Sequence, residues 1–334
     1  MLSFFKQKSA TSLVLQALPA LVCIAFGTPA RGQAPSPWPA KPVKIVVPYA
    51  PGGAVDAVTR KMAQKLTEQT GQSFFIENKA GATGTIGSAQ VAHAGADGYT
   101  LLANDTTYAL LPHIFKKLPF DPATELQPAA AFVFAPMAVA VRNEARYNTL
   151  ADLVKAGKAE ANRVTYGTGG AGTTPHFASE ALGIATGVNF MHVPYKGAGE
   201  ATLALVGGSI DFQIASTPGV MGQVKGGKLR LLAVSGDKRL AALPDVPTFA
   251  EAGVKGYGVV NFTGLWAPRG TPAEVLARLQ KEVAAAMATP DMKAYAEGIG
   301  AEAGYWDAPT FARQVTERTA FWGKVTANTA FEKQ

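Results

Sequence analysis

The sequence predicts an α/β protein, because strand signals and helix signals alternate along nearly the whole chain. Two units of strand, glycine-rich loop and helix, roughly a hundred residues apart, support this assignment. The chain has 334 residues, of which 48% are hydrophobic and 16% are charged. Such a length and composition are typical of one large or two ordinary globular domains.

The first 34 residues differ from the rest and predict a signal peptide over residues 1–34. Two lysines precede an apolar run, Leu13–Phe26, and small residues follow it, with cleavage expected after Ala30 or Ala34. A membrane anchor is the alternative, but the run is shorter than the ~20 residues that a spanning helix needs. We therefore expect a soluble mature protein in the periplasm.

Composition also excludes several classes of function. The formal net charge is +7, and the leader holds Lys6, Lys8 and Arg31 and no acid, so the rest keeps 7 − 3 = +4. No basic block with interleaved aromatic residues occurs, so nucleic-acid binding is not indicated. The single cysteine, Cys23, lies in the leader, which leaves no disulfide or thiol nucleophile. No metal, nucleotide or nucleophile-elbow motif is present, and we predict neither an enzyme nor a cofactor.

The first glycine-loop unit begins with the β-branched run Val43–Val47, which predicts a buried strand that ends at Pro48. A tight loop, Pro51 to Gly53, follows, and apolar residues at spacing four from Val58 predict a helix that stops at Gly71. The free N–H groups of a first helical turn form an anion site, and glycine lets a ligand approach the main chain. Alternatively, the two glycines only turn the chain.

Between the two units we expect three strands and two helices. Thr85 is the predicted cap of the first helix. The strands are predicted at Phe74–Glu77, Tyr99–Ala103 and Ala130–Val141, and the helices at Thr85–His93 and from the loop Asn104–Thr107 toward Phe115.

The second glycine-loop unit repeats the pattern of the first. Val164–Tyr166 predicts a strand, residues 167–172 a loop, and Thr173 or Thr174 a helix cap with Pro175 at or near the first helical position. Gly183 is the predicted helix end. If both helices begin at one cleft, a small carboxylate could be held there by uncharged backbone donors, although two ordinary turns would look the same.

The remaining elements follow in the same style. We expect Thr271–Glu274 to form a capping box with proline at the first helical position. The final helix should start near Asp307 and bury a stripe of Phe311, Val315 and Trp322. Further strands are predicted near Phe190–Val193, Ser209–Ala215, Leu229–Ser235 and Asn261–Ala267, and further helices over Gly199–Val206 and Val220–Val224.

Seven ordered motifs make the sequence similar to a known family. They lie at Trp38–Asp56, Glu77–Gly87, Asp97–Leu101, Leu118–Asp121, Tyr166–His176, His192–Gly197 and Leu243–Gly253. Together they resemble the Bug (TctC-like) family of periplasmic solute receptors, which serve tripartite tricarboxylate transporters. The resemblance covers nearly all of the mature chain. It departs from the family at Phe120, where tyrosine is common, and at Pro175.

The resemblance implies a two-lobed type II periplasmic binding protein fold: two doubly wound α/β domains with a ligand cleft between them. Lobe one would comprise residues 35–137 plus 263–334, and lobe two residues 138–262. The two glycine loops, Tyr49–Val55 and Thr168–Thr174, would hold a ligand carboxylate, partly through ordered waters. The expected ligand-binding residues are Tyr49, Ala50, Gly52, Gly53, Val55, Asp56, Gly84, Thr85, Asn104, Thr106, Thr107, Thr168, Gly169, Gly170, Gly172, Thr173, Thr174, His176, Tyr195 and Ser216.

The resemblance further implies a monomer that captures a small organic acid and delivers it to membrane subunits of such a transporter. A carboxylate-sensing receptor that docks on a membrane sensor kinase is one alternative. A secreted hydrolase that uses His176 is another. His176 could contact the ligand or only pack, and Lys196 is expected at the surface.

Overall fold

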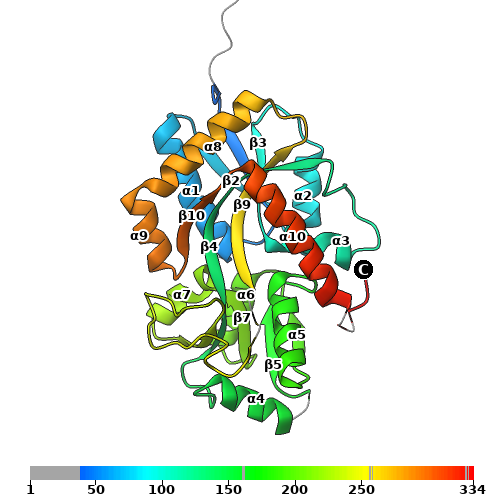
Figure 1. The fold of residues 1–334 in the computed structure, drawn as a ribbon, viewed down its shortest axis with the longest axis vertical. Coiled ribbons are helices and arrows are strands. Elements are labelled where there is room, and N and C mark those ends of the chain that lie inside the picture. Colours follow the sequence, from blue (N-terminus) through cyan, green and yellow to red (C-terminus); the bar gives the residue numbers. More distant parts are fainter. Residues whose placement is uncertain (1–37, 160–161, 256, 258, 328, 330) are drawn as a thin grey trace, which may run out of the picture. The chain divides into compact units, whose positions relative to one another are not determined.

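Strands and helices alternate along the chain, which confirms the predicted α/β class (Figure 1). The structure, a computed structural model, describes residues 38–159, 162–255, 257, 259–327, 329 and 331–334. The predicted signal peptide, residues 1–34, lies outside the described residues. None of the described helices is at once long and apolar enough to traverse a lipid bilayer.

The N-terminal part of the fold runs to the long strand β4. Its elements are β1 (Val43–Val47), α1 (Ala54–Thr70), β2 (Phe74–Asn78), the 3-10 helix η1 (Ala82–Gly84), α2 (Thr85–Ala92), β3 (Thr100–Asp105), the 3-10 helix η2 (Thr106–Leu110), α3 (Leu111–Ile114) and β4 (Leu126–Arg142).

The middle part contains α4 (Leu150–Ala159), β5 (Thr165–Thr168), α5 (Thr174–Thr186), β6 (Met191–Pro194), α6 (Ala198–Val206), β7 (Phe212–Ser216), α7 (Thr217–Lys225) and β8 (Leu229–Val234). The C-terminal part contains β9 (Val260–Pro268), α8 (Ala273–Ala288), α9 (Pro290–Gly298), β10 (Glu302–Trp306) and α10 (Ala308–Ala327).

Strand β4 connects two groups of strands. The described strands pair in the order β2-β1-β3-β9-β4-β7-β5-β6, with β8 and β10 also on β4. Up to Pro136, β4 pairs with β9, whereas from Met137 onward it pairs with β7 and β8. In Figure 1 the blue, orange and red elements surround one part of β4 and β9, and the green elements surround the other. This change of partner supports a lobe boundary near residue 137, although the exact boundaries remain a prediction.

The described strands pair in parallel within each group, whereas every pairing that involves β4 or β9 is antiparallel. Strand β1 pairs in parallel with β2 and β3, and β5 pairs in parallel with β6 and β7. Loops at the carboxyl ends of parallel strands lie along one edge of a sheet. The glycine loops after β1 and β5 are loops of this kind, and each leads into a helix.

Burial explains why the first unit folds as predicted. Ile45 and Val47 of β1 and Val58, Met62 and Leu66 of α1 are all fully buried in one hydrophobic cluster. Burying each such side chain contributes about 1.5–3 kcal/mol. Helix α1 ends at Gly71, whose φ of 72° is left-handed, as the sequence predicts.

Two predicted helix ends are wrong. Helix α5 does not stop at Gly183 but continues to Thr186, because Gly187 supplies the left-handed C-cap with a φ of 67°. The predicted capping box at Thr271–Glu274 does not form. Helix α8 begins at Ala273 with Pro272 outside it, and the Thr271 hydroxyl donates to the carbonyl of Pro268 at 2.8 Å.

Two further local predictions are wrong. Thr85 is not a cap but the first residue of α2, and its hydroxyl donates back to the Ala82 carbonyl at 2.9 Å. Asn104–Thr107 is not a loop: β3 extends through Asp105, and a 3-10 helix starts at Thr106. The Asp105 carboxylate accepts from the Thr107 N–H at 2.9 Å, and this capping bond turns the chain.

Four described elements were not predicted from the sequence: η1, α4, α9 and β10. A capping signal marks the start of α4, where the Asp152 N–H donates to the Thr149 hydroxyl and the Thr149 N–H donates to the Asp152 carboxylate. Helix α9 follows Thr289 in the same way, because Met292 N–H donates to its hydroxyl. Helix α7 is also longer than the predicted Val220–Val224.

Candidate functional site

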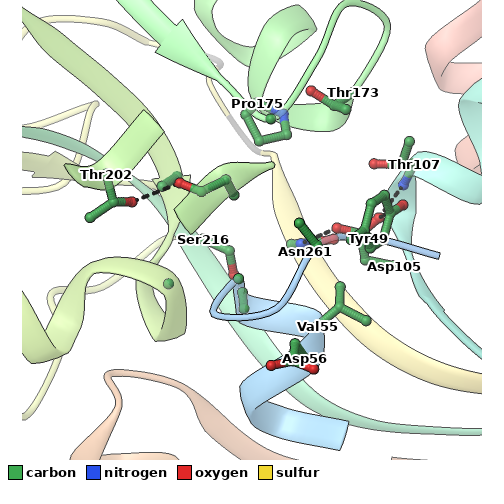
Figure 2. A pocket seen from close by; sticks show the side chains of 17 residues that line it. Tyr49, Val55, Asp56, Asp105, Thr107, Thr173, Pro175, Thr202, Ser216 and Asn261 are labelled. Atoms are coloured by element: carbon green, nitrogen blue, oxygen red, sulfur yellow. Dashed lines mark hydrogen bonds between the residues drawn. The ribbon is translucent and has the colours of Figure 1, made fainter. Parts of the chain in front are cut away.

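A cavity lies between the glycine-loop regions, and side chains and backbone from distant parts of the chain surround it (Figure 2). It leaves about 60 Å³ for the centres of water-sized molecules. Roughly 10–15 Å³ suffices for one water, so the cavity has room for several waters or a small ligand. Its lining residues are Tyr49, Ala50, Gly53, Ala54, Val55, Asp56, Asp105, Thr107, Gly169, Thr173, Pro175, Ala198, Thr202, Ala215, Ser216, Gly219 and Asn261.

Four helices begin at this cavity. The lining includes Ala54 at the start of α1, Thr173 before α5, Ala198 at the start of α6 and Ser216 before α7. The first N–H groups of a helix have no intrahelical acceptor, and the helix dipole places a partial positive charge behind them. The arrangement therefore favours a negatively charged group in the cavity.

The helix N-termini approach one another closely. A Cβ atom built on Gly53 would lie 3.7 Å from the Cβ of Ala198, and one built on Gly219 would lie 3.6 Å from the Cβ of Ala54. A Cβ on Gly169 would lie only 2.6 Å from the backbone nitrogen of Ala198. The second glycine loop therefore requires glycine at 169 to pack against the start of α6.

The first glycine loop is held by the carboxylate of Asp56, in the first turn of α1. One oxygen accepts from Gly52 N–H at 3.0 Å and from Arg60 Nε at 3.0 Å. The other accepts from Asn78 Nδ2 at 2.9 Å and pairs with Arg60 Nη2 at 2.9 Å. Burial opposes ionisation of Asp56, but these donors outweigh it and lower its pKa. Asp56 is therefore an ionised brace for the loop.

The second glycine loop is held by hydroxyl and imidazole groups. The Thr168 hydroxyl lies 2.7 Å from His192 Nε2, and Gly172 N–H donates to His176 Nδ1 at 3.2 Å. The two imidazole rings stack, with centroids 4.2 Å apart. Burial, reinforced by nearby His192, lowers the pKa of His176 to about 3, and burial lowers that of His192 to about 4. Both rings are thus neutral at physiological pH.

A polar cluster forms the third side of the cavity. Tyr49 Oη donates to Asn104 Oδ1 at 2.6 Å and lies 3.3 Å from Asp105 Oδ1. Asn261 Nδ2 donates to Asp105 Oδ2 at 3.1 Å. Burial raises the pKa of the Asp105 carboxyl, while hydrogen bonds from Asn261, Thr107 and Tyr49 oppose that effect. Burial and the charge of Asp105 also raise the pKa of Tyr49, which keeps its phenol protonated.

Direct hydrogen bonds join the 3-10 helices η1 and η2 to the second glycine loop. The Thr107 and Thr174 hydroxyls are 3.1 Å apart, and Thr174 N–H donates to the Thr107 hydroxyl at 3.2 Å. The Thr83 hydroxyl donates to the carbonyl of Ala171 at 2.8 Å. These contacts connect residues near 83 and 107 with residues near 171 and 174, which are remote from them in sequence.

The structure brings some of the predicted ligand-binding residues together at the cavity and places others behind it. Those that line it are Tyr49, Ala50, Gly53, Val55, Asp56, Thr107, Gly169, Thr173 and Ser216. Those that do not are Gly52, Gly84, Thr85, Asn104, Thr106, Thr168, Gly170, Gly172, Thr174, His176 and Tyr195.

Several of the second group support the lining from behind. Asn104 accepts from the Tyr49 phenol, and Gly84 lies against the Tyr49 ring, where an added Cβ would come within 3.4 Å. Thr168 and His176 hold the second glycine loop. Tyr195 packs near Gly167, since a Cβ atom built on Gly167 would lie 3.2 Å from the Tyr195 ring. Lys196 is exposed, as expected from the sequence.

Further lining residues were not among those named individually as ligand-binding from the sequence: Ala54, Asp105, Pro175, Ala198, Thr202, Ala215, Gly219 and Asn261. Of these, Ala54 lies within the predicted first glycine loop, Tyr49–Val55, and Asp105 within the predicted loop Asn104–Thr107. A signal for Ala198 and Gly219 was available, because β6 and β7, like β1 and β5, each lead into a helix through glycine or serine. No local signal could place Asn261, which meets Asp105 across 156 positions of sequence.

Within the described residues, neither the cavity lining nor any other region offers three or more His, Cys, Asp or Glu side chains grouped as a metal site. The lining also lacks lysine, arginine and histidine, and its 17 residues all belong to the described part of the chain. An anion in this cavity would therefore meet helix N-termini and hydroxyls, no cationic side chain, and the two carboxyl groups of Asp56 and Asp105.

Comparisons with known proteins show which family the chain resembles. The sequence model described as "Tripartite tricarboxylate transporter family receptor" matches residues 58–330. A UPF0065 protein from the tcbD-tcbE intergenic region of Pseudomonas sp. (strain P51) is 35% identical over 263 residues, which cover 78% of either chain.

Two solved structures are similar over most of their length. The periplasmic binding protein BugD superposes with a TM-score of 0.85 at 33% identity, covering 89% of this chain and 100% of that chain. Rpa4515 of R. palustris, solved with adipate, superposes with a TM-score of 0.84 at 33% identity, covering 87% of this chain and 97% of that chain. These neighbours confirm the predicted two-lobed fold of periplasmic binding proteins.

Proposed function

Because this chain belongs to the family of tripartite tricarboxylate transporter receptors, we propose that it captures a small carboxylate in the cavity at the four helix N-termini. The family consists of receptors, and the chain is accordingly a solute-binding protein, not an enzyme. Its cavity corresponds in kind to the ligand site of a two-lobed binding protein.

The observation that carries the proposal is the convergence of α1, α5, α6 and α7 on a cavity whose described lining contains no cationic side chain. Backbone donors are fixed by the helices, so little reorganisation is needed when an anion enters. Hydrogen bonds to an ionised group contribute roughly 1.5–3 kcal/mol each. Several such bonds would support micromolar binding, which needs about 8 kcal/mol. The adipate in the structure of Rpa4515 supports a carboxylate as the ligand class.

The rest of the proposal concerns capture and delivery. Lobe one, residues 35–137 plus 263–334, and lobe two, residues 138–262, would close over the ligand, with contacts such as Thr107–Thr174 favouring the closed form. The protein would act as a periplasmic monomer after removal of residues 1–34. It would then deliver the acid to the membrane subunits of a tripartite tricarboxylate-type transporter, without a cofactor.

Ligand identification tests the proposal directly. Protein purified without added ligand should carry an organic acid that mass spectrometry detects after denaturation. In a thermal-shift screen of mono- and dicarboxylic acids, at least one acid should raise the melting temperature of the protein, because a ligand that binds only the folded state stabilises that state. If no acid is carried and none shifts the melting temperature, while neutral sugars or cations do, the proposed ligand class is wrong.

A further inference from the structure

Two carboxyl groups line the cavity, and the protein satisfies them to different extents. An ionised carboxylate offers about four acceptor positions. Asp56 fills them with Gly52 N–H, Asn78 Nδ2 and the two nitrogens of Arg60. It therefore has no accepting capacity left for a ligand.

Asp105 is satisfied less completely. Its Oδ1 accepts from Thr107 N–H at 2.9 Å, and its Oδ2 accepts from Asn261 Nδ2 at 3.1 Å. The phenol of Tyr49 is 3.3 Å from Oδ1 but only 2.6 Å from Asn104 Oδ1. A phenol has one proton, and the shorter contact takes it. The Thr107 hydroxyl is a further donor to the Asp105 carboxyl group. Three of its roughly four acceptor positions are thus filled and one remains, although only 8% of the residue is exposed.

The hydrogen bonds around Asp105 fix which of its neighbours are donors. The Asn261 Oδ1 atom accepts from Thr106 N–H at 3.1 Å and from Phe262 N–H at 3.1 Å, so its Nδ2 must be the atom that faces Asp105. Thr107 contributes a backbone N–H, which can only donate. Both oxygens of Asp105 therefore meet obligate donors, which favour the carboxylate form, whereas burial raises the pKa of the group.

Asp105 and Asn261 both line the cavity (Figure 2), so a ligand in the cavity can reach the Asp105 carboxyl group. A second ligand carboxylate placed there would be repelled by the ionised form of Asp105, without a lysine, arginine or histidine in the described lining to offset that charge. A hydroxyl or ammonium group would instead donate a hydrogen bond to Asp105 and fill its remaining acceptor position.

We propose that Asp105 selects acids that carry a hydrogen-bond donor, a hydroxyl or an amino group, over unsubstituted acids of the same carbon skeleton. This inference rests on the proposed function, since the helix N-termini would hold the carboxylate while Asp105 accepts from the donor. Sites built to pair with a ligand OH or NH discriminate strongly against analogues that lack it, because the buried protein group is then left unpaired.

Calorimetric titration with matched acids tests the inference. The probes are succinate, malate and aspartate, then glutarate, 2-hydroxyglutarate and glutamate, then butyrate, 3-hydroxybutyrate and 3-aminobutyrate. The wild-type protein should bind a donor-bearing member of at least one set about tenfold or more tightly than the unsubstituted member. In Asp105→Asn, which keeps the shape but removes the charge, that ratio should fall to about threefold or less.

Asp97→Asn is the matched control, because it removes the same charge from an exposed carboxylate that pairs with Lys41. It should keep the wild-type ratio. A wild-type protein that binds unsubstituted acids as tightly as their donor-bearing partners overturns the inference and leaves the proposed function intact, and this arm needs no variant. A ratio that persists in a folded Asp105→Asn protein also overturns the role of Asp105. Absence of binding by every acid overturns the proposed function and this inference together.

Discussion

The first glycine loop, Tyr49–Val55, is held by an ionised carboxylate, whereas the second, Thr168–Thr174, is held by neutral hydroxyls and imidazoles. Asp56 accepts from Gly52 in the first loop and from Arg60 in α1. His192 and His176 contact Thr168 and Gly172 in the second. Both loops end at a helix N-terminus on the same cavity. The same local motif can therefore be stabilised by charge or without it, and the two loops should respond differently to pH and to substitution.

The largest expected difference between the loops is their response to acid. The folded-state pKa values of His176 and His192, about 3 and about 4, lie below the ordinary 6.5. The unfolded chain therefore binds more protons below pH 6.5, and the free energy of unfolding should fall as pH drops from 6.5 toward 4. The slope is at most about 1.4 kcal/mol per pH unit for each histidine. Urea unfolding at pH 7, 6 and 5 measures it.

Variants of the two loops separate the contributions. His192→Gln keeps a polar group near Thr168 but does not titrate, so it should flatten the dependence between pH 7 and 5. Asp56 has a pKa below its usual 3.8, so its contribution is present above pH 3.8 and is lost only as pH falls through its folded value. Asp56→Asn should leave the slope between pH 7 and 5 unchanged. An unchanged slope in both His192→Gln and His176→Asn would refute the histidine mechanism.

Removing the brace of the first loop should have the next largest effect. Asp56→Ala leaves Gly52 N–H without its acceptor and removes one of the two acceptors of Asn78 Nδ2, and we expect a loss of about 2–4 kcal/mol in the free energy of unfolding. The Arg60 side chain is 50% exposed, so its pairing with Asp56 is screened by water. Arg60→Ala should therefore cost less than about 1 kcal/mol. Chemical denaturation of both variants measures the two losses in the free energy of unfolding. Equal losses would mean that Asp56 stabilises the protein through the ion pair with Arg60 and not through the loop.

A glycine substitution in each loop gives a smaller contrast. In Gly169→Ser the Cβ would lie 2.6 Å from the Ala198 nitrogen, and we expect overpacking to cost about 1–3 kcal/mol. In Gly53→Ser the Cβ would lie 3.7 Å from the Ala198 Cβ, and serine is a good residue at this N-cap position. That variant should lose less than about 0.5 kcal/mol. Thermal unfolding compares them, and a greater loss for Gly53→Ser would contradict the packing described for the two loops.

The smallest expected effect concerns the exposed cation near the second loop. Lys196 does not line the cavity, and its charge is solvated. Lys196→Ala should therefore change the affinity for the bound acid less than about twofold, and raising salt from low to physiological ionic strength should weaken binding only modestly. Calorimetry at two salt concentrations measures both. A tenfold loss in Lys196→Ala would mean that a side-chain ion pair, rather than the helix N-termini, holds the anion.

The sequence by itself determined the α/β class, the two glycine-loop units and most strands, because these depend on local patterns. Val43–Val47 followed by Pro48 predicts a strand and its end without knowledge of any other residue. Helix ends were less predictable, since Gly183 and Gly187 are both plausible stops and only the second adopts the left-handed conformation. The motifs at residues 49–56 and 166–176 also identified the two loops that border the cavity.

Only the tertiary structure decided which other residues join those loops. The N-termini of α6 and α7 reach the cavity because β5, β6 and β7 lie in parallel order and direct their following helices to the same edge. Asn261 meets Asp105 because β9 pairs with both β3 and β4. Pairing between strands so far apart is set by the burial of whole sheets rather than by residues near Asp105 in sequence, so no local pattern could place that contact.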